Sequence, residues 1–400
     1  MKKLIKNAKI LNDNNELKDV HILIDDGKIK KILNFNEDLS AFSNVLATDV
    51  NGCLLLSGFI NSRSSLLKKF FYSLKDFNNY EAFLEEFEIF KNSLTNEEKY
   101  LIYKFEIENA IKNGITTLLD EDMFSLPFKK AVKETGINCV YKLGLNSCIE
   151  NFDEKQINNL LNSNENFIFA LNNVLFNSED NFESFIKLSK VHKKPLLCNG
   201  SFNIEIEGSI DSEFGLTNIK MLNSIGFFET DNILFSPNVL DKEDFKILNE
   251  NNSKLIFSPS FNLNFGFEIA NIYALNKNNK IGLASFENDF FKEMYLLKNL
   301  EKNHYNQMNL FSSLNCFNMC TKQNAKILSL KNTGEIKEGN NVDFVMYNLD
   351  KNLQNESLIF SLNPSKISSV YILGNEYNTN NLLNNELIEK IKNIVNKKNL

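Results

Sequence analysis

Few side chains in this sequence have the types and spacing of a reactive site, and Arg63 is the first of them. It lies near the end of an apolar run at residues 54–65, which is typical of a buried strand. A guanidinium fixed there would either bind an anionic ligand or pair with a carboxylate and plug the site. Pairing is the favoured interpretation, with Asp120, Glu121 and Glu287 as the candidate partners. The same four residues form the candidate ligand-binding group.

A short acidic run follows a second apolar run at residues 114–120. It consists of Asp120, Glu121 and Asp122. Such a run can hold a cation loosely, but a solvated loop is its more common role. Glu287 and Asp289 could supply one further carboxylate, and one carboxylate does not make a transition-metal site.

Histidine is too scarce for most of the usual catalytic arrangements. The chain has three, His21, His192 and His304, expected in an N-terminal strand, before a strand and in a helix–helix connection. Cys198 therefore has no histidine to activate it as a nucleophile, and we expect a buried thiol. The sequence contains no G-x-S-x-G, Walker-type or G-x-G-x-x-G motif.

The elements that must position these side chains alternate between short apolar runs and amphipathic helices. The apolar runs lie at residues 114–120, 167–170, 195–198, 233–235, 254–257 and 280–284. Helices are expected at residues 80–90, 97–113, 181–192 and 241–249. This alternation, over roughly 270 residues, predicts a (β/α)8 barrel with its reactive side chains at the carboxyl ends of the strands.

Strand patterns at both ends of the chain predict a second, smaller domain. A hairpin is expected at residues 20–33, and strands return at residues 334–339, 342–347 and 370–373. We therefore expect an α/β protein in which a small β-sandwich domain flanks the barrel. The expected boundaries are 1–56 plus 333–375 for the β domain, 57–332 for the barrel and 376–400 for a helical tail.

The bulk composition narrows the possible partners. A chain of 400 residues, 43% of them hydrophobic, can bury a large core. The net charge of −7 argues against nucleic acid as a partner. The first residues lack a signal-peptide pattern, and no apolar run approaches the ~18 residues of a membrane span. Together with six cysteines, this favours a cytoplasmic protein with reduced thiols and without a membrane partner.

Several motifs together resemble the amidohydrolase superfamily. Residues 54–65 resemble its first barrel strand, L-x-x-P-G-F-I-N-x-H-x-H, and residues 113–117 resemble its G-[VI]-T-T. Residues 257–263 resemble its P-x-S-N-x-x-L loop, and residues 324–343 its A-[KR]-x-L-G…G-x-[IL]-x-x-G-x-x-A-D signature. The nearest branch resembles chlorohydrolases and purine-type deaminases, such as methylthioadenosine/adenosylhomocysteine and aminofutalosine deaminases. The resemblance implies a metal-dependent hydrolase barrel.

The family's metal ligands and its acid–base residues fall on different residue types in this sequence. The resemblance places the two first-strand histidines on Arg63 and Ser65. It places the other histidines on Asn173, Asn199 and Ser236, and the glutamate and aspartate on Phe202 and Phe286. With Ser285, the serines and asparagines would give the pocket a neutral lining, and the two phenylalanines would fill it with apolar bulk.

The family's reaction uses a divalent metal to turn water into hydroxide near neutral pH. With all ligand positions substituted, we expect no metal, no cofactor, no catalytic residue and a degenerate site. The protein would act by binding a small polar or anionic ligand, an active paralogue or a second copy of itself. The alternative is an active hydrolase or deaminase acting on a purine-nucleoside-like or other C–N substrate through a non-standard or metal-independent site.

Overall fold

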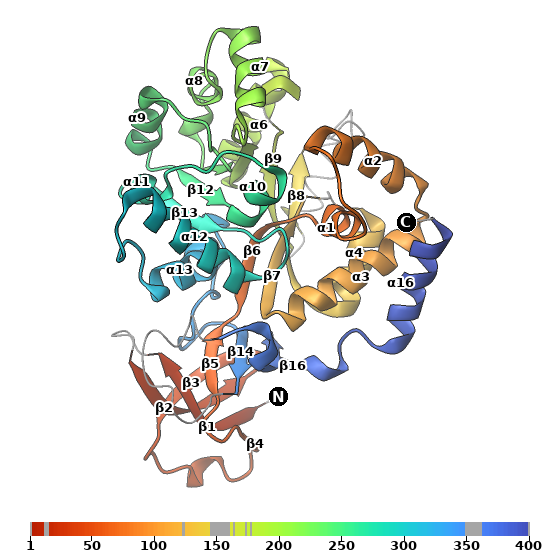
Figure 1. Cartoon of the computed structure of the whole chain (residues 1–400). Helices are drawn as coiled ribbons and strands as arrows, with labels where there is room; N and C mark the ends of the chain where they lie inside the picture. Colours follow the sequence, from red (N-terminus) through yellow and green to blue (C-terminus); the bar gives the residue numbers. More distant parts are fainter. Residues whose placement is uncertain are drawn as a thin grey trace.

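Eight parallel strands in sequence order form one of the two sheets of the protein. The computed structural model describes residues 2–11, 16–121, 125–144, 161–162, 165–172, 174–176, 178–348 and 362–398. The strands follow one another from β6 to β13 without a crossover. They are β6 (Phe59–Ser64), β7 (Ile115–Asp120), β8 (Asn138–Gly144), β9 (Asn166–Ala170), β10 (Leu196–Asn199), β11 (Asn232–Phe235), β12 (Lys254–Phe257) and β13 (Lys280–Leu283). The predicted (β/α)8 barrel is confirmed (Figure 1).

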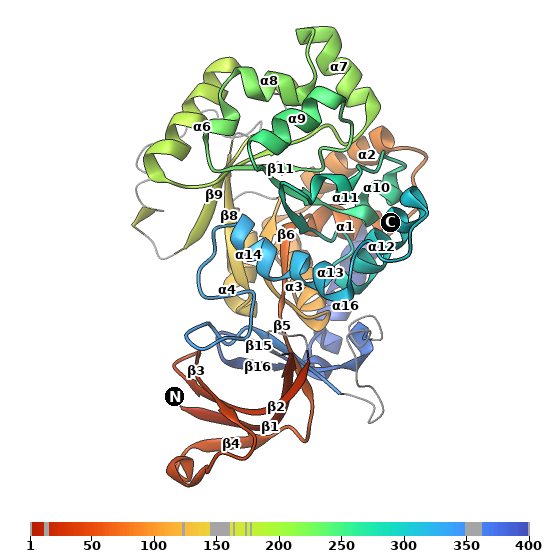
Figure 2. The ribbon, with the colours of Figure 1, turned by 90° about the vertical axis from the view of Figure 1, so that its left-hand side faces the viewer.

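Helices surround this barrel, as the two views at right angles show (Figures 1 and 2). The four helices expected from the sequence correspond to α2, α3, α6 and α9. The helices of the barrel region are α1 (Leu66–Tyr72), α2 (Tyr80–Ser93), α3 (Asn96–Lys112), α4 (Leu126–Thr135), α6 (Glu179–His192), α7 (Ile204–Phe214), α8 (Asn218–Ser224), α9 (Lys242–Glu250), α10 (Pro259–Phe265), α11 (Ile272–Leu275), α12 (Phe290–Tyr305), α13 (Ser313–Cys320) and α14 (Lys322–Ile327).

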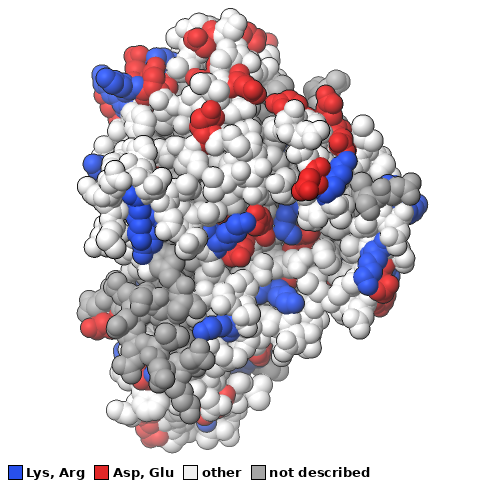
Figure 3. Space-filling model, in the orientation of Figure 1, with Lys and Arg blue, Asp and Glu red and all other residues white. Residues whose placement is uncertain are grey.

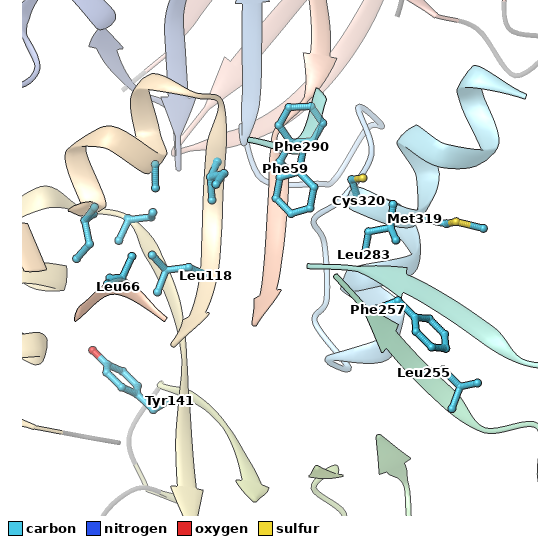
Figure 4. Close-up of a cluster of buried hydrophobic side chains, with 14 of the residues drawn as sticks. Phe59, Leu66, Leu118, Tyr141, Leu255, Phe257, Leu283, Phe290, Met319 and Cys320 are labelled. Atoms are coloured by element: carbon cyan, nitrogen blue, oxygen red, sulfur yellow. The ribbon is translucent and has the colours of Figure 1, made fainter. Parts of the chain in front are cut away.

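The barrel strands are buried on both faces because their side chains alternate between the interior and the helices. Ile60, Leu119 and Val140 belong to the cluster that fills the barrel. Phe59, on the opposite face of β6, stacks on Phe290 of α12 with ring centroids 5.1 Å apart (Figure 4). The strand ends are therefore held by packing on both sides, which gives the site rigid supports.

Side chains close the ring between the first and last barrel strands. The Asn324 amide of α14 donates to the backbone oxygens of Ile60 and Leu283, at 2.7 and 2.6 Å. The Asn61 amide donates to the Ser285 carbonyl at 2.8 Å, and its oxygen accepts from the Ser285 backbone nitrogen. All of these asparagine and serine side chains are buried. β6 is thereby fixed against β13 just before it reaches Arg63.

The apolar run at residues 54–65, which resembles the family's first barrel strand as a whole, divides between the two sheets. β5 (Leu54–Ser57) belongs to the other sheet and β6 to the barrel. Gly58 separates them, and a Cβ there would lie 2.2 Å from a methyl group of Thr116. Only glycine fits such a close approach, so the chain can pass from one sheet to the other at this point.

Both ends of the chain contribute to the second sheet, which also has eight strands, as predicted. Its order is β16-β15-β14-β5-β1-β2-β3, with β4 paired to β1. The strands are β1 (Lys3–Leu11), β2 (Leu17–Asp25), β3 (Lys28–Asn34), β4 (Leu46–Asp49), β5, β14 (Phe344–Tyr347), β15 (Ile367–Ile372) and β16 (Asn375–Asn378). The strand predicted at residues 334–339 is wrong. That segment consists of bends and a turn, with Gly334 and Gly339 at positive φ, a conformation that does not continue a strand.

The helix expected in the tail is α16 (Asn385–Lys397), which runs along α3 on the outside of the barrel (Figure 1). None of the helices among the described residues is long and apolar enough to cross a membrane. On the face shown in Figure 3, the described lysine and arginine side chains are dispersed, and several lie beside acidic ones.

Candidate functional site

Arg63 lies at the carboxyl end of β6, with its side chain 9% exposed. Its Nε donates to Glu121 Oε1 at 2.7 Å. Nη2 donates to the same oxygen, and Nη1 donates to Asn199 Oδ1. The guanidinium carbon lies 3.6 Å from the centre of the Phe235 ring. Strands β6, β10 and β11 and the residue after β7 thus hold one guanidinium at the mouth of the barrel.

Glu121 is the centre of the charge cluster. Its second carboxylate oxygen accepts from Lys68 at 2.8 Å, and its side chain is 15% exposed. Burial by itself would raise the pKa of Glu121, but the positive charges of Arg63, Lys68 and Lys142 lower it well below the usual range. Glu121 is therefore ionised at neutral pH. The expected pairing of Arg63 with a carboxylate occurs with this residue.

Asp120, another expected partner of Arg63, has a structural contact instead. It is 2% exposed, and its Oδ2 accepts from Ser64 Oγ at 2.6 Å and from the Leu66 backbone nitrogen at 3.0 Å. The carboxylate thus holds the first turn of α1 against the end of β6. Asp120 is the last residue of β7 and Glu121 follows it. Adjacent residues of an extended chain point to opposite faces, so Asp120 and Glu121 have different partners. Asp122 lies outside the described residues.

Glu287 and Asp289 lie on the loop before α12. Glu287 pairs with Lys292 at 2.6 Å and accepts from the Asn264 amide at 2.9 Å. Asp289 caps α12 by accepting from the Lys292 backbone nitrogen at 3.1 Å. The described contacts of these carboxylates therefore stay within the loop's own surroundings, and they do not join the Arg63 cluster.

The two phenylalanines that the resemblance assigns to the family's carboxylate positions lie in one aromatic cluster. Phe202 and Phe286 both contact Phe261, with centroids 6.1 and 5.7 Å apart. Phe267 completes the buried cluster, and Tyr80 packs against it. Apolar rings fill the space around both positions. The expectation of apolar bulk there agrees with this packing.

The other positions carried over from the resemblance are small and polar. Ser65 precedes α1 and is 7% exposed. Ser236 is fully buried at a positive φ of 47°, and its hydroxyl has no hydrogen-bond partner among the described residues. The Ser285 hydroxyl accepts from the Asp289 backbone nitrogen at 2.9 Å. Asn173 lies outside the described residues.

These side chains do not fit a divalent metal ion. Hydrolase metals are bound by imidazole, carboxylate or thiolate donors, whereas these positions offer a guanidinium, hydroxyls, an amide and phenyl rings. In the part of the chain that the structure describes, no three His, Cys, Asp or Glu side chains are grouped so that they could hold a metal. His21 bridges the Asn7 nitrogen and the Phe35 carbonyl in the small domain, each at 3.0 Å. His192 and His304 lie near the ends of α6 and α12.

Lys142 is the functional residue that sequence reasoning missed. It lies on β8, two residues after Val140 of the barrel interior, so both face inward. Lys142 is only 7% exposed. Burial, and then the charge of Arg63, lower the pKa of Lys142 to about 8. A lysine within an apolar strand pattern, V-Y-K-L-G at residues 140–144, was the available signal.

Comparison with known proteins gives consistent results. The family model described as "Amidohydrolase family" matches residues 56–377. A 5-methylthioadenosine/S-adenosylhomocysteine deaminase of Dictyoglomus turgidum is 27% identical over 88% of this chain and 86% of its own length. A 5'-deoxyadenosine deaminase of Methanosphaera stadtmanae is 26% identical over 87% and 85%.

Solved structures show the same fold at lower identity. An adenosine deaminase from Xanthomonas campestris with bound zinc matches with a TM-score of 0.87 at 14% identity, over 99% of this chain and 98% of that one. A guanine deaminase from C. acetobutylicum with bound guanine matches with a TM-score of 0.76 at 17% identity, over 94% and 100%.

Proposed function

Because the chain belongs to the amidohydrolase family, we propose that it uses the family's barrel to bind a small anionic ligand, and that it does not catalyse metal-dependent hydrolysis. The observation that carries the proposal is the position of Arg63. The resemblance assigns Arg63 to the position of a metal ligand, and its guanidinium is fixed by Glu121, Asn199 and the Phe235 ring. A fixed cation can replace the charge of a metal without supplying its hydroxide.

The balance of charge at the mouth favours an anion. Arg63, Lys68 and Lys142 are the cations. Glu121 is the carboxylate that faces the first two, and the charge of Asp120 also acts on Lys142. Three cations and two carboxylates give the cluster more positive than negative charge, and Lys142 has no hydrogen bond or ion pair among the described residues. Three of the five N–H donors of a guanidinium are used by Glu121 and Asn199. The remaining donors are available to carboxylate or phosphate oxygens.

Anion binding can be tested with a matched pair of double variants. Arg63→Gln with Glu121→Gln removes the central ion pair without leaving one charge buried alone. Glu287→Gln with Lys292→Gln removes an ion pair of the loop before α12. We expect acetate and phosphate to raise the Tm of the wild type and of the Glu287→Gln/Lys292→Gln variant. The same anions should raise the Tm of the Arg63→Gln/Glu121→Gln variant much less. Equal anion effects on all three proteins would overturn the proposal.

A second candidate function is hydrolytic deamination of a 5'-modified adenosine. The names of the two relatives, which are 26–27% identical over most of the chain, favour it. Incubation with 5'-deoxyadenosine and 5-methylthioadenosine, with and without added zinc, distinguishes the candidates. We expect no release of ammonia. Release that a chelator abolishes would establish the second candidate in place of the first.

A further inference from the structure

Lys142 differs from the other deeply buried lysine of the barrel, Lys254. Lys254, at the opposite end of its strand, is 8% exposed, and its amine binds Asp231 at 2.6 Å and the Ile327 carbonyl at 3.1 Å. Lys142 is 7% exposed and has no such partner among the described residues. Burying an amine without a partner is costly. Because Lys142 lies at the mouth of the barrel without a partner among the described residues, its amine is available there as a reactive group.

The surroundings of Lys142 make its protonated form less favourable than that of an ordinary lysine. The charged and titratable groups that act on it are Arg63, Lys68, Asp120, Glu121 and Cys198. Burial, then repulsion by Arg63 and Lys68, outweighs attraction by the two carboxylates and lowers the pKa of Lys142 to about 8. A sizeable fraction of the amine therefore carries a free electron pair near neutral pH, as a nucleophile requires.

We propose that Lys142 forms an imine with the carbonyl carbon of a small ligand that also carries a carboxylate or phosphate group. This inference rests on the proposed anion site, since Arg63 and Lys68 would hold the anionic group. The amine electron pair attacks the carbonyl carbon, and the carbonyl oxygen leaves as water with the two amine protons. Lysine and ligand thus give imine and water, with no oxidation or reduction.

The ligand class follows from charge. A protonated imine beside two cations is unfavourable unless the ligand brings a negative charge of its own. An oxo acid such as glyoxylate does so, whereas a neutral aldehyde does not. The apolar ring of Phe235, stacked on Arg63, and the rings around Phe202 and Phe286 border the polar cluster and lower the local dielectric.

The test is reductive trapping on the full chain. The wild type is incubated with glyoxylate and sodium cyanoborohydride, which reduces an imine to a stable secondary amine, and the modified lysines are located by peptide mass spectrometry. We expect Lys142 to be labelled at least about tenfold faster than exposed lysines. Lys254 serves as the buried control and should remain unlabelled. Labelling confined to exposed lysines would overturn the inference.

The pH dependence of Lys142 labelling is a second readout, because the exposure of a lysine alone would not change its titration midpoint. Labelling of Lys142 should rise with pH about a midpoint near 8, compared with 10.5 for an ordinary lysine. A midpoint near the ordinary value would contradict the inference. Lys142→Met should lose this adduct, and the wild-type data stand even if that variant folds poorly.

Acetaldehyde separates failure of the inference from failure of the proposed function. Slower labelling of Lys142 by acetaldehyde than by glyoxylate supports both. Equal labelling by the two aldehydes supports the imine but contradicts the anion site. Stabilisation by acetate and phosphate without any Lys142 adduct overturns the imine and leaves the anion site standing.

Discussion

Arg63 and Glu121 stabilise each other in a setting where neither would be tolerated alone. Both are largely buried, at 9% and 15% exposure, and ions out of water need a partner. Lys68 donates a further hydrogen bond to Glu121, and Asn199 accepts one from Arg63. The pair therefore fixes the mouth of the barrel in a single arrangement.

A double-mutant cycle tests this coupling. Arg63→Met leaves Glu121 without its main partner and should lower the free energy of unfolding by about 3 kcal/mol. Arg63→Met combined with Glu121→Gln should cost clearly less than the sum of the two single changes. Urea denaturation of the four proteins measures the difference, and strictly additive costs would show that the two side chains are not coupled.

Glu293 gives a prediction about pH. Burial raises the pKa of this carboxyl on α12 to about 8, although the Ser260 backbone nitrogen donates to it at 3.1 Å. The unfolded chain has its pKa near 4.5. The stabilising contribution of Glu293 is therefore fully present below pH 4.5 and is lost as the pH rises to about 8.

The variant Glu293→Gln stays neutral, so its stability should fall less than that of the wild type between pH 5 and pH 8. Urea denaturation at the two pH values measures this. Glu250→Gln, an exposed change on α9, should keep the wild-type dependence. An unchanged dependence in Glu293→Gln would mean that this carboxyl is ionised in the folded protein.

For the individual residues, the sequence predicted part of the site. The type and position of Arg63 predicted a carboxylate partner, but three candidates remained. The choice of Glu121 over Asp120 depends on which face of β7 each occupies, and on the ladder contact from the Glu121 nitrogen to Ser64. Residues 138–144 were not among the predicted apolar strands because Lys142 interrupts their apolar pattern. Only the barrel places the charge of Lys142 beside Arg63.

Among the elements, the contact between β6 and β13 depends on buried amides. Asn324 bridges both strands, and Asn61 repeats the link one residue further along β6. A cyclic sheet must satisfy the edges of its first and last strands. Here side chains from α14 and β6 take part in doing so.

Asn324→Ala should therefore lower the free energy of unfolding by about 2 kcal/mol or more, because two buried carbonyl oxygens lose a donor. Asn299→Ala, which removes an exposed amide bond to the Tyr295 carbonyl, should change it little. Chemical denaturation of both variants provides the comparison. Equal costs would mean that the barrel closes without this bridge.

The elements also show where sequence patterns succeed and fail. Apolar runs predicted most barrel strands because both of their faces are buried. The segment 334–339 has a strand-like pattern, yet its two glycines adopt positive φ and turn the chain. The division of residues 54–65 between two sheets depends on the close approach of Gly58 to Thr116, a tertiary contact that a local pattern does not contain.

The whole molecule combines the barrel of the amidohydrolase family with a charged cluster around Arg63 at its mouth. The cluster inside the barrel includes Phe235 at the end of β11, and the packing outside it includes Phe257 and Leu283 at the ends of β12 and β13 (Figure 4), so the same apolar core that stabilises the fold supports the mouth. The tail helix α16 belongs to the same body. Its Leu387, Ile391 and Ile394 are buried, and Lys397 binds Glu98 of α3 at 2.8 Å.

Ile391→Ala should lower the free energy of unfolding by about 2–4 kcal/mol, because a buried aliphatic side chain is lost. Glu389→Ala, on the exposed side of the same helix, should have little effect. Urea midpoints of the two variants measure the contrast. A negligible cost for Ile391→Ala would show that α16 does not stabilise the barrel.

The measurement that bears most directly on the central claim is the metal content of the purified protein after growth with added zinc, iron and manganese. Arg63, Ser65, Asn199 and Ser236 provide no imidazole, carboxylate or thiolate donor. Elemental mass spectrometry should therefore find far less than one ion per chain after mild chelation. A stoichiometric ion that resists chelation, together with zinc-dependent release of ammonia from 5'-deoxyadenosine, would contradict the claim and identify the protein as a working deaminase.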